Sequence, residues 1–231
     1  MIPVSSILST TNRNTTVTEV QSDAPEIEGV IKYHLDYRPA PASPLVGFAD
    51  LNAWRSLLWR LGLIGQDPAR YGGLGYGNVS VRSSPGYFGI TGTQTGHLPH
   101  LTAQHYVQVL RAEPDENYLQ AEGPIAPSSE ALTHAAVYAA SSRVDCVVHV
   151  HSPEIWQRVG ALALPCVPAH IAYGTPAMAE QVGALVRRQP DQGVIAMLGH
   201  EDGLISYGAT PEQACWLLVR ALAESYAKER P

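Results

Sequence analysis

Two histidines stand two positions apart at the end of an apolar stretch, residues 145–151, in which valine predominates. This stretch predicts a buried β-strand, and alternate side chains of a strand face the same side. His149 and His151 therefore present two imidazoles within the span of one metal ion. Neighbouring imidazoles repel each other when charged and need separate partners when neutral. The pattern thus favours metal binding over two strand-end histidines that hold no ligand.

A third imidazole, His200, follows a second apolar stretch, residues 194–198, which also predicts a buried strand. Three histidines from two strand ends can form a His₃ site that keeps one coordination position open. Such a site retains the full positive charge of its ion, which suits a Lewis acid that polarises a carbonyl or binds an enolate. Imidazole ligands favour Zn²⁺, with Mn²⁺, Fe²⁺ or Co²⁺ as alternatives.

Glu130 is a candidate acid/base beside this cation. It lies in the first turn of a predicted helix, directly after Ser128 and Ser129. A carboxylate next to a bound cation could accept a proton while the metal holds the resulting anion. The alternative is an ordinary favourable charge at a helix N-terminus. The two serines mark a helix start, where unpaired N–H groups favour a negatively charged ligand.

Two further segments could contact a ligand. Residues 71–77 contain four glycines, which allow tight turns and a close approach of the backbone, and Asn78 follows them. Thr93 and Gln94 belong to a polar loop, residues 92–96, whose hydroxyls and N–H groups could hold an anion or a polyol. A purely structural turn is the alternative for the glycine-rich segment.

The elements that must position these residues follow from periodicity and turn signals. Apolar residues at helical spacing predict a helix over residues 51–61, and Thr-Pro pairs predict helices that begin near residues 175 and 210. Strands are predicted at residues 29–35, 78–81, 87–91, 106–110, 117–120, 145–151, 194–198 and 204–208. The four from residue 78 to residue 120 suggest an antiparallel meander. A Pro-rich linker is expected at residues 38–44. Strands interleave with helices, so a sheet layered by helices in one domain is the simplest architecture.

Composition limits the class of protein. The 231 residues are 45% hydrophobic and 16% charged, which is enough for one domain with a normal core. The formal charge of −6 argues against a nucleic-acid partner. No apolar run approaches the roughly 20 residues that cross a bilayer, and the first residues lack the features of a signal peptide. Three cysteines without CxxC spacing fit reduced thiols in a cytoplasmic protein.

The motifs together resemble the class II aldolase/adducin-like superfamily over roughly residues 50–228. They are Gly77-Asn78-Val79-Ser80, Ile90-Thr91-Gly92-Thr93, Pro127-Ser128-Ser129-Glu130, His149-Val150-His151 and Gly203-Leu204 with Gly208. The resemblance implies an α/β fold with three layers, α/β/α, around a mostly antiparallel central sheet. We expect this domain at residues 25–231, after a flexible N-terminal arm at residues 1–24. The resemblance also implies a homotetramer, a role in carbohydrate metabolism and a small-molecule substrate.

By resemblance, His149 and His151 are zinc ligands and Glu130 is the acid/base. Polar substrate contacts are expected from Asn78, Thr93, Gln94, Ser128 and Ser129. The expected function is that of a zinc-dependent lyase of aldolase type. It would act on a hydroxy-carbonyl, sugar-derived substrate through a metal-stabilised enediolate. An epimerase, dehydratase or decarboxylase on the same metal site, or a non-catalytic adducin-like interaction module, are the alternatives.

The sequence departs from the superfamily pattern at three positions. The last ligand usually precedes a glycine directly, but Asp202 precedes Gly203 and His200 lies two residues earlier. We favour His200 because imidazole matches the other two ligands. The segment 156–173 is short and lacks the usual proton-donating tyrosine, so Tyr173 is the candidate substitute. Gln94 stands where phosphate binders keep a glycine, which leaves open whether the substrate is phosphorylated.

Overall fold

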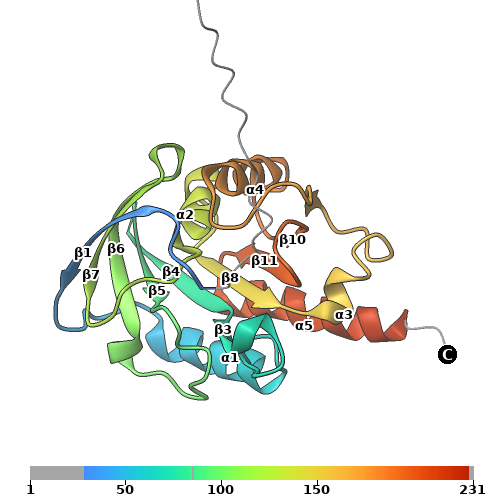
Figure 1. Ribbon diagram of the computed structural model, residues 1–231, viewed down its shortest axis with the longest axis horizontal. Helices are drawn as coiled ribbons and strands as arrows, with labels where there is room; N and C mark the ends of the chain where they lie inside the picture. Colours follow the sequence, from blue (N-terminus) through green and yellow to red (C-terminus); the bar gives the residue numbers. More distant parts are fainter. Residues whose placement is uncertain (1–28, 85, 229–231) are drawn as a thin grey trace, which may run out of the picture.

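The computed structural model describes residues 29–84 and 86–228, in which helices cover both faces of a large sheet (Figure 1). The nine strands of the sheet run in the order β1-β7-β6-β5-β4-β8-β11-β10-β9. All inner pairs are antiparallel, and the parallel pairs are the two at the edges, β1 with β7 and β9 with β10. The predicted α/β class with a mostly antiparallel sheet is therefore confirmed. The arm expected at residues 1–24 lies outside the described residues.

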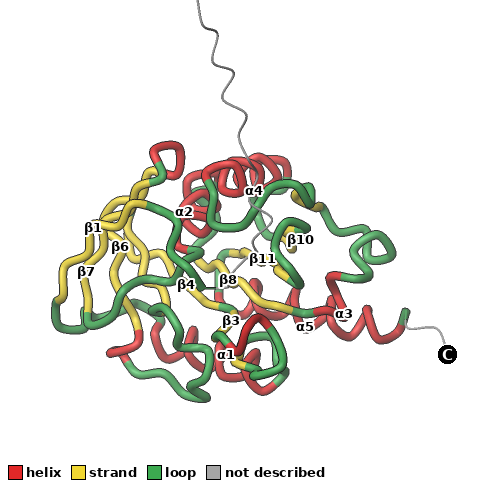
Figure 2. The backbone as a smooth tube through the Cα atoms, viewed as in Figure 1, coloured by secondary structure: helices red, strands yellow, loops and turns green. Residues whose placement is uncertain are grey.

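The strands of the main sheet are β1 His34–Pro39, β4 Asn78–Ser84, β5 Tyr87–Thr91, β6 Tyr106–Glu113, β7 Tyr118–Gly123, β8 Cys146–His151, β9 Cys166–Val167, β10 Gly193–Met197 and β11 Gly203–Gly208. A small separate pair consists of β2 Gly65–Gln66 and β3 Gly75–Tyr76. The helices are α1 Phe48–Arg60, α2 Ala131–Ala140, α3 Pro153–Trp156, α4 Pro176–Arg188 and α5 Pro211–Ala227. Figure 2 shows how the helices flank the strands.

The two faces of the sheet bury separate cores, and the central strand β8 contributes to both. Val148 and Val150 pack with residues of α1 and α5 on one face. Val147 packs with residues of α2 and α4 on the other face. Because side chains alternate along a strand, His149 and His151 share the α2/α4 face with Val147. The alternation therefore directs both imidazoles into one layer of the molecule.

Threonine caps fix where the two long C-terminal helices begin. Thr175 Oγ1 accepts a hydrogen bond from the backbone N–H of Met178 at 3.2 Å. Thr210 Oγ1 accepts one from the N–H of Gln213 at 3.1 Å. Each cap satisfies an N–H group that has no partner inside its helix, and such caps stabilise a protein by about 1 kcal/mol. The predicted starts of both helices are confirmed.

The N-terminal edge of the sheet differs from the prediction. The strand expected at residues 29–35 is displaced to β1, which includes Arg38 and Pro39 from the expected linker. β1 lies at the edge and pairs with β7 alone, where a proline costs few ladder hydrogen bonds. Tyr33 instead precedes the strand, and its hydroxyl donates to the carbonyl of Ser128 at 2.8 Å.

The three cysteines lie among the described residues. All three cysteines are free, with Cys146 and Cys215 buried and Cys166 half-buried. Burial raises the pKa of the Cys146 thiol, which keeps it protonated and unreactive. Among the described residues, no helix has the length and apolar character that a membrane span requires.

Candidate metal centre

Three imidazoles meet at one end of the central strands. His149 and His151 come from β8, and His200 comes from the turn between β10 and β11. One ring nitrogen of each lies within 4.8 Å of the other two. The three side chains are at most 2% exposed, and the Nε2 atoms of His149 and His151 are 3.1 Å apart. The structure thus brings together all three predicted ligands.

The hydrogen bonding of His149 fits a metal ligand. Its Nδ1 donates to the carbonyl of Leu204 at 3.0 Å, which leaves a lone pair on Nε2, the atom that faces His151. Two nitrogen ligands of a tetrahedral Zn²⁺ lie roughly 3.3 Å apart, close to the observed separation. Burial, and then the neighbouring His200, lowers the pKa of both β8 imidazoles. They are therefore neutral near pH 7, which is the form that binds metals.

His200 is held by ring contacts and by a glycine. Its ring stacks on His149 with centroids 5.0 Å apart and on Tyr173 with centroids 4.3 Å apart. A Cβ at Gly203 would lie 2.9 Å from the His200 ring, so a larger residue would displace it. Asp202, the alternative third ligand, does not belong to the cluster of potential ligands found among the described residues.

Tyr173 lies beside the cluster but is fully buried. Lys32 Nζ stands 3.6 Å from the centroid of its ring and donates to its backbone carbonyl at 3.0 Å. Ring stacking joins Tyr173 to His200 at an interplanar angle of 18°. These contacts give the ring a packing role next to the imidazoles. A catalytic role for its hydroxyl stays a prediction.

A small polar pocket adjoins the imidazole cluster. All five residues expected to contact the substrate line it, together with Thr95 and glycines: Asn78, Thr93, Gln94, Ser128 and Ser129. Asn78 pairs with His149 across β4 and β8, which places the pocket next to the cluster. Its Oδ1 is buried and has no hydrogen-bond partner among the described residues. None of the lining residues is charged, so the pocket offers hydroxyls, amides and backbone groups.

The turns around this pocket require glycine. Gly77 has a φ of +77°, and a Cβ there would lie 2.8 Å from the Ile64 side chain. A Cβ at Gly96 would lie 2.2 Å from the carbonyl of Gly65. Gln94, itself at a φ of 56°, accepts a hydrogen bond through Oε1 from the N–H of Gly75 at 3.0 Å. The side chain of Gln94 therefore occupies the Gly75 N–H, a backbone donor that lines the pocket.

Glu130 is the N-cap residue of α2, on the same sheet face as the imidazoles, and is 1% exposed. Thr133 Oγ1 donates to Glu130 Oε2 at 3.0 Å, and Ser128 Oγ accepts from the Glu130 N–H at 3.3 Å. Burial, and then the charge of Glu130, raises the pKa of Tyr33. Tyr33 was missed from the sequence because it precedes a strand whose limits were wrongly predicted.

The sequence also missed a charged group on the outer side of His151. Tyr71 donates from its hydroxyl to Asp202 Oδ2 at 2.7 Å, and Arg70 lies 3.5 Å from the same oxygen. The Tyr71 ring meets the His151 ring edge-on, with centroids 4.5 Å apart. In the sequence, the glycines of this segment were the only signal, and they did not indicate which neighbours would reach the site.

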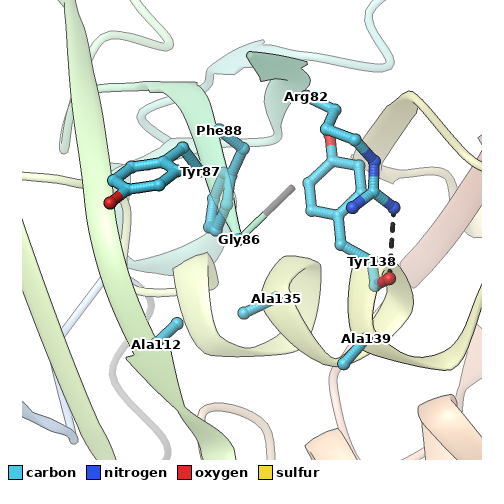
Figure 3. Close-up of a pocket in the computed structure, with 8 residues that line it drawn as sticks. All are labelled: Arg82, Gly86, Tyr87, Phe88, Ala112, Ala135, Tyr138 and Ala139. Carbon is cyan, nitrogen blue, oxygen red and sulfur yellow. Dashed lines mark hydrogen bonds between the residues drawn. The ribbon is translucent and has the colours of Figure 1, made fainter. Parts of the chain in front are cut away.

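A second, mostly apolar pocket lies between the β4–β5 hairpin and α2 (Figure 3). None of the predicted site residues lines it. At its rim, Arg82 donates to the carbonyls of Tyr138 at 3.1 Å and Ser141 at 2.9 Å. Those carbonyls belong to the end of α2, so Arg82 serves to cap the helix.

A family model and a curated relative match part of this chain. Residues 69–157 match the family described as Class II Aldolase and Adducin N-terminal domain. This match supports the class II aldolase superfamily for this chain. A curated superfamily relative, the 5-methylthioribulose-1-phosphate/5-deoxyribulose-1-phosphate aldolase of Escherichia coli O45:K1 (strain S88 / ExPEC), is 28% identical over 120 residues. That match covers 44% of this chain and about half of the relative, 54%.

Solved structures of superfamily relatives agree with the fold. The L-fuculose-1-phosphate aldolase of Thermus thermophilus matches with a TM-score of 0.55 and 21% identity, over 80% of this chain and 97% of the other. A sugar-phosphate aldolase of Thermotoga maritima matches with a TM-score of 0.52 and 14% identity, over 79% of this chain and 96% of the other. At these identities, the likeness establishes a common class II aldolase fold.

Proposed function

We propose that this chain is a divalent-metal-dependent lyase of aldolase type that acts on a sugar-derived hydroxy-carbonyl substrate, with Zn²⁺ as its cation. The observation that carries this proposal is the cluster of three buried imidazoles beside a neutral pocket lined by hydroxyls and amides. A cation in an all-imidazole site supplies a Lewis acid that stabilises negative charge on the carbonyl oxygen of a substrate.

His149, His151 and His200 are the proposed ligands. The hydrogen bond from His149 Nδ1 to the Leu204 carbonyl holds one ring in the tautomer that exposes Nε2. Stacking on Tyr173 holds the His200 ring from the side. The residues of the site are therefore oriented by main chain and ring contacts before any substrate enters.

Glu130 is the proposed acid/base. Two features support this role: Glu130 is the N-cap of α2, on the sheet face that carries the imidazoles, and it directly follows Ser129 of the pocket lining. Thr133 holds one carboxylate oxygen. Cleavage of the carbon–carbon bond next to a hydroxyl requires removal of that hydroxyl proton, and an enediolate then remains on the other fragment. Glu130 would take and return the proton.

The pocket is proposed to hold the hydroxyl or phosphate end of the substrate. Asn78 contributes a buried amide oxygen that has no partner among the described residues. Ser128 and Ser129, at the start of α2, can hold either a hydroxyl or an anion. The name of the curated relative, an aldolase of 5-methylthioribulose 1-phosphate, supports testing phosphorylated ketoses first.

The test is an assay of the metal-loaded protein with aldehyde and ketose partners, with and without phosphate. A lyase yields two carbonyl fragments. Retention of mass with a new stereoisomer would indicate an epimerase, loss of water a dehydratase, and release of CO₂ a decarboxylase. A non-catalytic adducin-like module would turn over none of these and need hold no metal. Failure to bind a divalent cation would contradict the proposal.

Glu130→Gln is the matched variant for the proton-transfer step. It keeps the size of the side chain and a group that can accept the bond from Thr133, so the metal should stay bound. Turnover is expected to fall by about 10²–10⁴-fold. Full activity in this variant would remove Glu130 from the mechanism.

Tyr173→Phe tests the second predicted catalytic residue. The substitution keeps the ring on His200 and removes the hydroxyl. A proton donor at this position predicts a loss of turnover of at least about 100-fold. Unchanged turnover would leave Tyr173 with its packing role alone.

We further propose that residues 25–231 form a single domain and that the cytoplasmic protein assembles as a homotetramer. The measurement is light scattering on the eluting peak of a sizing column. A mass of one chain would contradict the homotetramer.

A further inference from the structure

The outer side of His151 is packed by two aromatic rings of the glycine-rich segment. Tyr71 meets the imidazole edge-on at 4.5 Å between centroids, and Tyr76 lies tilted at 5.4 Å. Arg70 places its guanidinium over both tyrosine rings, 4.8 Å and 5.4 Å from their centroids. The ring orientation of His151 is therefore set partly by a segment that lies some 80 residues earlier in the chain, on the order of a third of its length.

Asp202 links this segment to the turn that carries His200. Its Oδ2 accepts the hydrogen bond from the Tyr71 hydroxyl at 2.7 Å and lies 3.5 Å from the Arg70 guanidinium. Arg70 in turn donates to the Tyr71 oxygen.

The backbone at both ends of this link is left-handed. Tyr71 has a φ of 51° and Asp202 a φ of 59°. Aspartate tolerates this conformation better than most residues, whereas tyrosine adopts it rarely. Strained residues of this kind persist where surrounding contacts hold them, and they cluster at functional sites. Two such residues from distant segments are bonded to each other at this point.

Asp202 also reaches His151 through the main chain. Its carbonyl accepts a hydrogen bond at 2.9 Å from the N–H of Ser152, the residue directly after His151. Gly203, the residue after Asp202, pairs with His151 in the β8–β11 ladder. Asp202 therefore contacts the main chain next to His151 through its own carbonyl. Through Tyr71, it also supports the imidazole ring of His151.

We propose that Asp202 is a positioning residue that acts through Tyr71, so that it orients His151 toward the cation without itself ligating it. This inference rests on the proposed function, because it requires the imidazole cluster to hold a metal. Direct ligation of the cation by the Asp202 carboxylate is the competing arrangement, in which the bond from Tyr71 to Oδ2 is not needed to hold the metal. Removal of the Tyr71 hydroxyl lowers the affinity for the metal in the first arrangement and leaves it unlowered in the second.

The test measures Zn²⁺ affinity by competition with a chelator, in the full chain, for Tyr71→Phe, Asp202→Asn and the double variant. Asparagine suits the left-handed φ at residue 202, and phenylalanine keeps the ring against His151. Loss of an outer partner of a metal-bound histidine typically lowers metal affinity by about 10–100-fold. We expect each single variant to bind Zn²⁺ about ten-fold more weakly. The affinity of the double variant should lie within about two-fold of the singles, because both substitutions break the same link.

Tyr37→Phe is the matched control. Its hydroxyl donates to the carbonyl of Gly123 at 2.7 Å, the same length as the bond of Tyr71, in the edge strand β1. Zn²⁺ affinity should not change in this variant. The visible spectrum of Co²⁺ bound in place of zinc should change in Tyr71→Phe and stay constant in Tyr37→Phe.

Tyr71→Phe with the Zn²⁺ affinity of the original protein would overturn the inference, as would effects that add in the double variant. Loss of all metal binding in Asp202→Asn, with Tyr71→Phe unaffected, would make Asp202 a ligand. These outcomes differ from a failure of the proposed function, in which the original protein itself would bind no stoichiometric Zn²⁺.

Discussion

The imidazole cluster and the polar pocket lie side by side, but different kinds of structure hold them. Two of the three imidazoles belong to the central strand β8, whose main chain is hydrogen-bonded to β4 on one side and to β11 on the other. The pocket is lined mainly by turns and a helix start, with Gln94 in a left-handed conformation. Rigid elements hold a catalytic geometry better than loops, whereas loops change more readily between relatives. We therefore expect the strands to hold the proposed metal ligands and the turns to determine which substrate binds.

This difference predicts that substitutions in the cluster abolish metal binding, whereas substitutions in the pocket change which ligand the pocket prefers. His149→Ala should have the largest effect, because it removes one of three ligands from the metal. We expect Zn²⁺ affinity to fall by more than about 100-fold, beyond the loss that an outer partner causes. Chelator competition measures it. Affinity equal to that of the original protein would exclude the cluster as the metal centre.

The buried residue His134, on the sheet face that carries the cluster, should make the stability of the protein depend on pH. Ser80 Oγ lies 2.7 Å from His134 Nδ1 and 2.7 Å from the Tyr138 hydroxyl, all of them buried. Burial lowers the pKa of His134 to about 3. The unfolded chain therefore binds a proton near pH 6.5 that the folded chain does not bind, so stability is lost as the pH falls from about 6.5 toward 3.

In metal-free protein, His134 alone should lower the free energy of unfolding by about 1.4 kcal/mol for each pH unit of acidification in that range. The measurement is the free energy of unfolding in urea at several pH values, for the original protein and for His134→Gln. The variant should show a slope shallower by one proton. Equal slopes in the two proteins would mean that His134 does not stay neutral in the folded chain.

The smallest effect is expected in the pocket. Gln94→Gly removes the side chain that uses the Gly75 N–H, and glycine suits the φ of 56° at this position. Because one hydrogen bond contributes about 0.5–1.5 kcal/mol, the freed donor should strengthen binding of inorganic phosphate by roughly two- to ten-fold. Competitive inhibition by phosphate measures this, with Gln94→Glu as the opposite case. A stronger effect on metal affinity than on phosphate binding would contradict the separation of the two regions.

Local patterns were sufficient for most of the fold. Residues 87–91 and the helix from Pro176 to Arg188 lie where strand alternation and the Thr175 cap predict them. The side chains of β1 do alternate between exposed and half-buried, but its limits are set by the parallel pairing with β7, from His34 opposite Tyr118 to Pro39 opposite Gly123. Its position depends on a partner some 80 residues away, on the order of the length of a small domain, and nothing local encodes that partner.

The same limit applies to the site. His149 and His151 follow from a period of two on one strand, and the pocket residues follow from turn and cap chemistry. Tyr71 and Asp202 could not be linked from the sequence, because their hydrogen bond joins a glycine-rich turn to the β10–β11 turn. The left-handed backbone at Tyr71 has no signature in the sequence, because tyrosine rarely adopts it, and an aspartate such as Asp202 is enriched there without being specific to it.

The most direct test of the central claim is X-ray absorption at the zinc edge of the loaded protein. Three imidazole nitrogens at about 2.0–2.1 Å, with one further light ligand, are expected from His149, His151 and His200. The signal should lose one imidazole in His200→Ala. A shell of oxygen ligands with fewer than two imidazoles, or an unchanged shell in His200→Ala, would contradict the account.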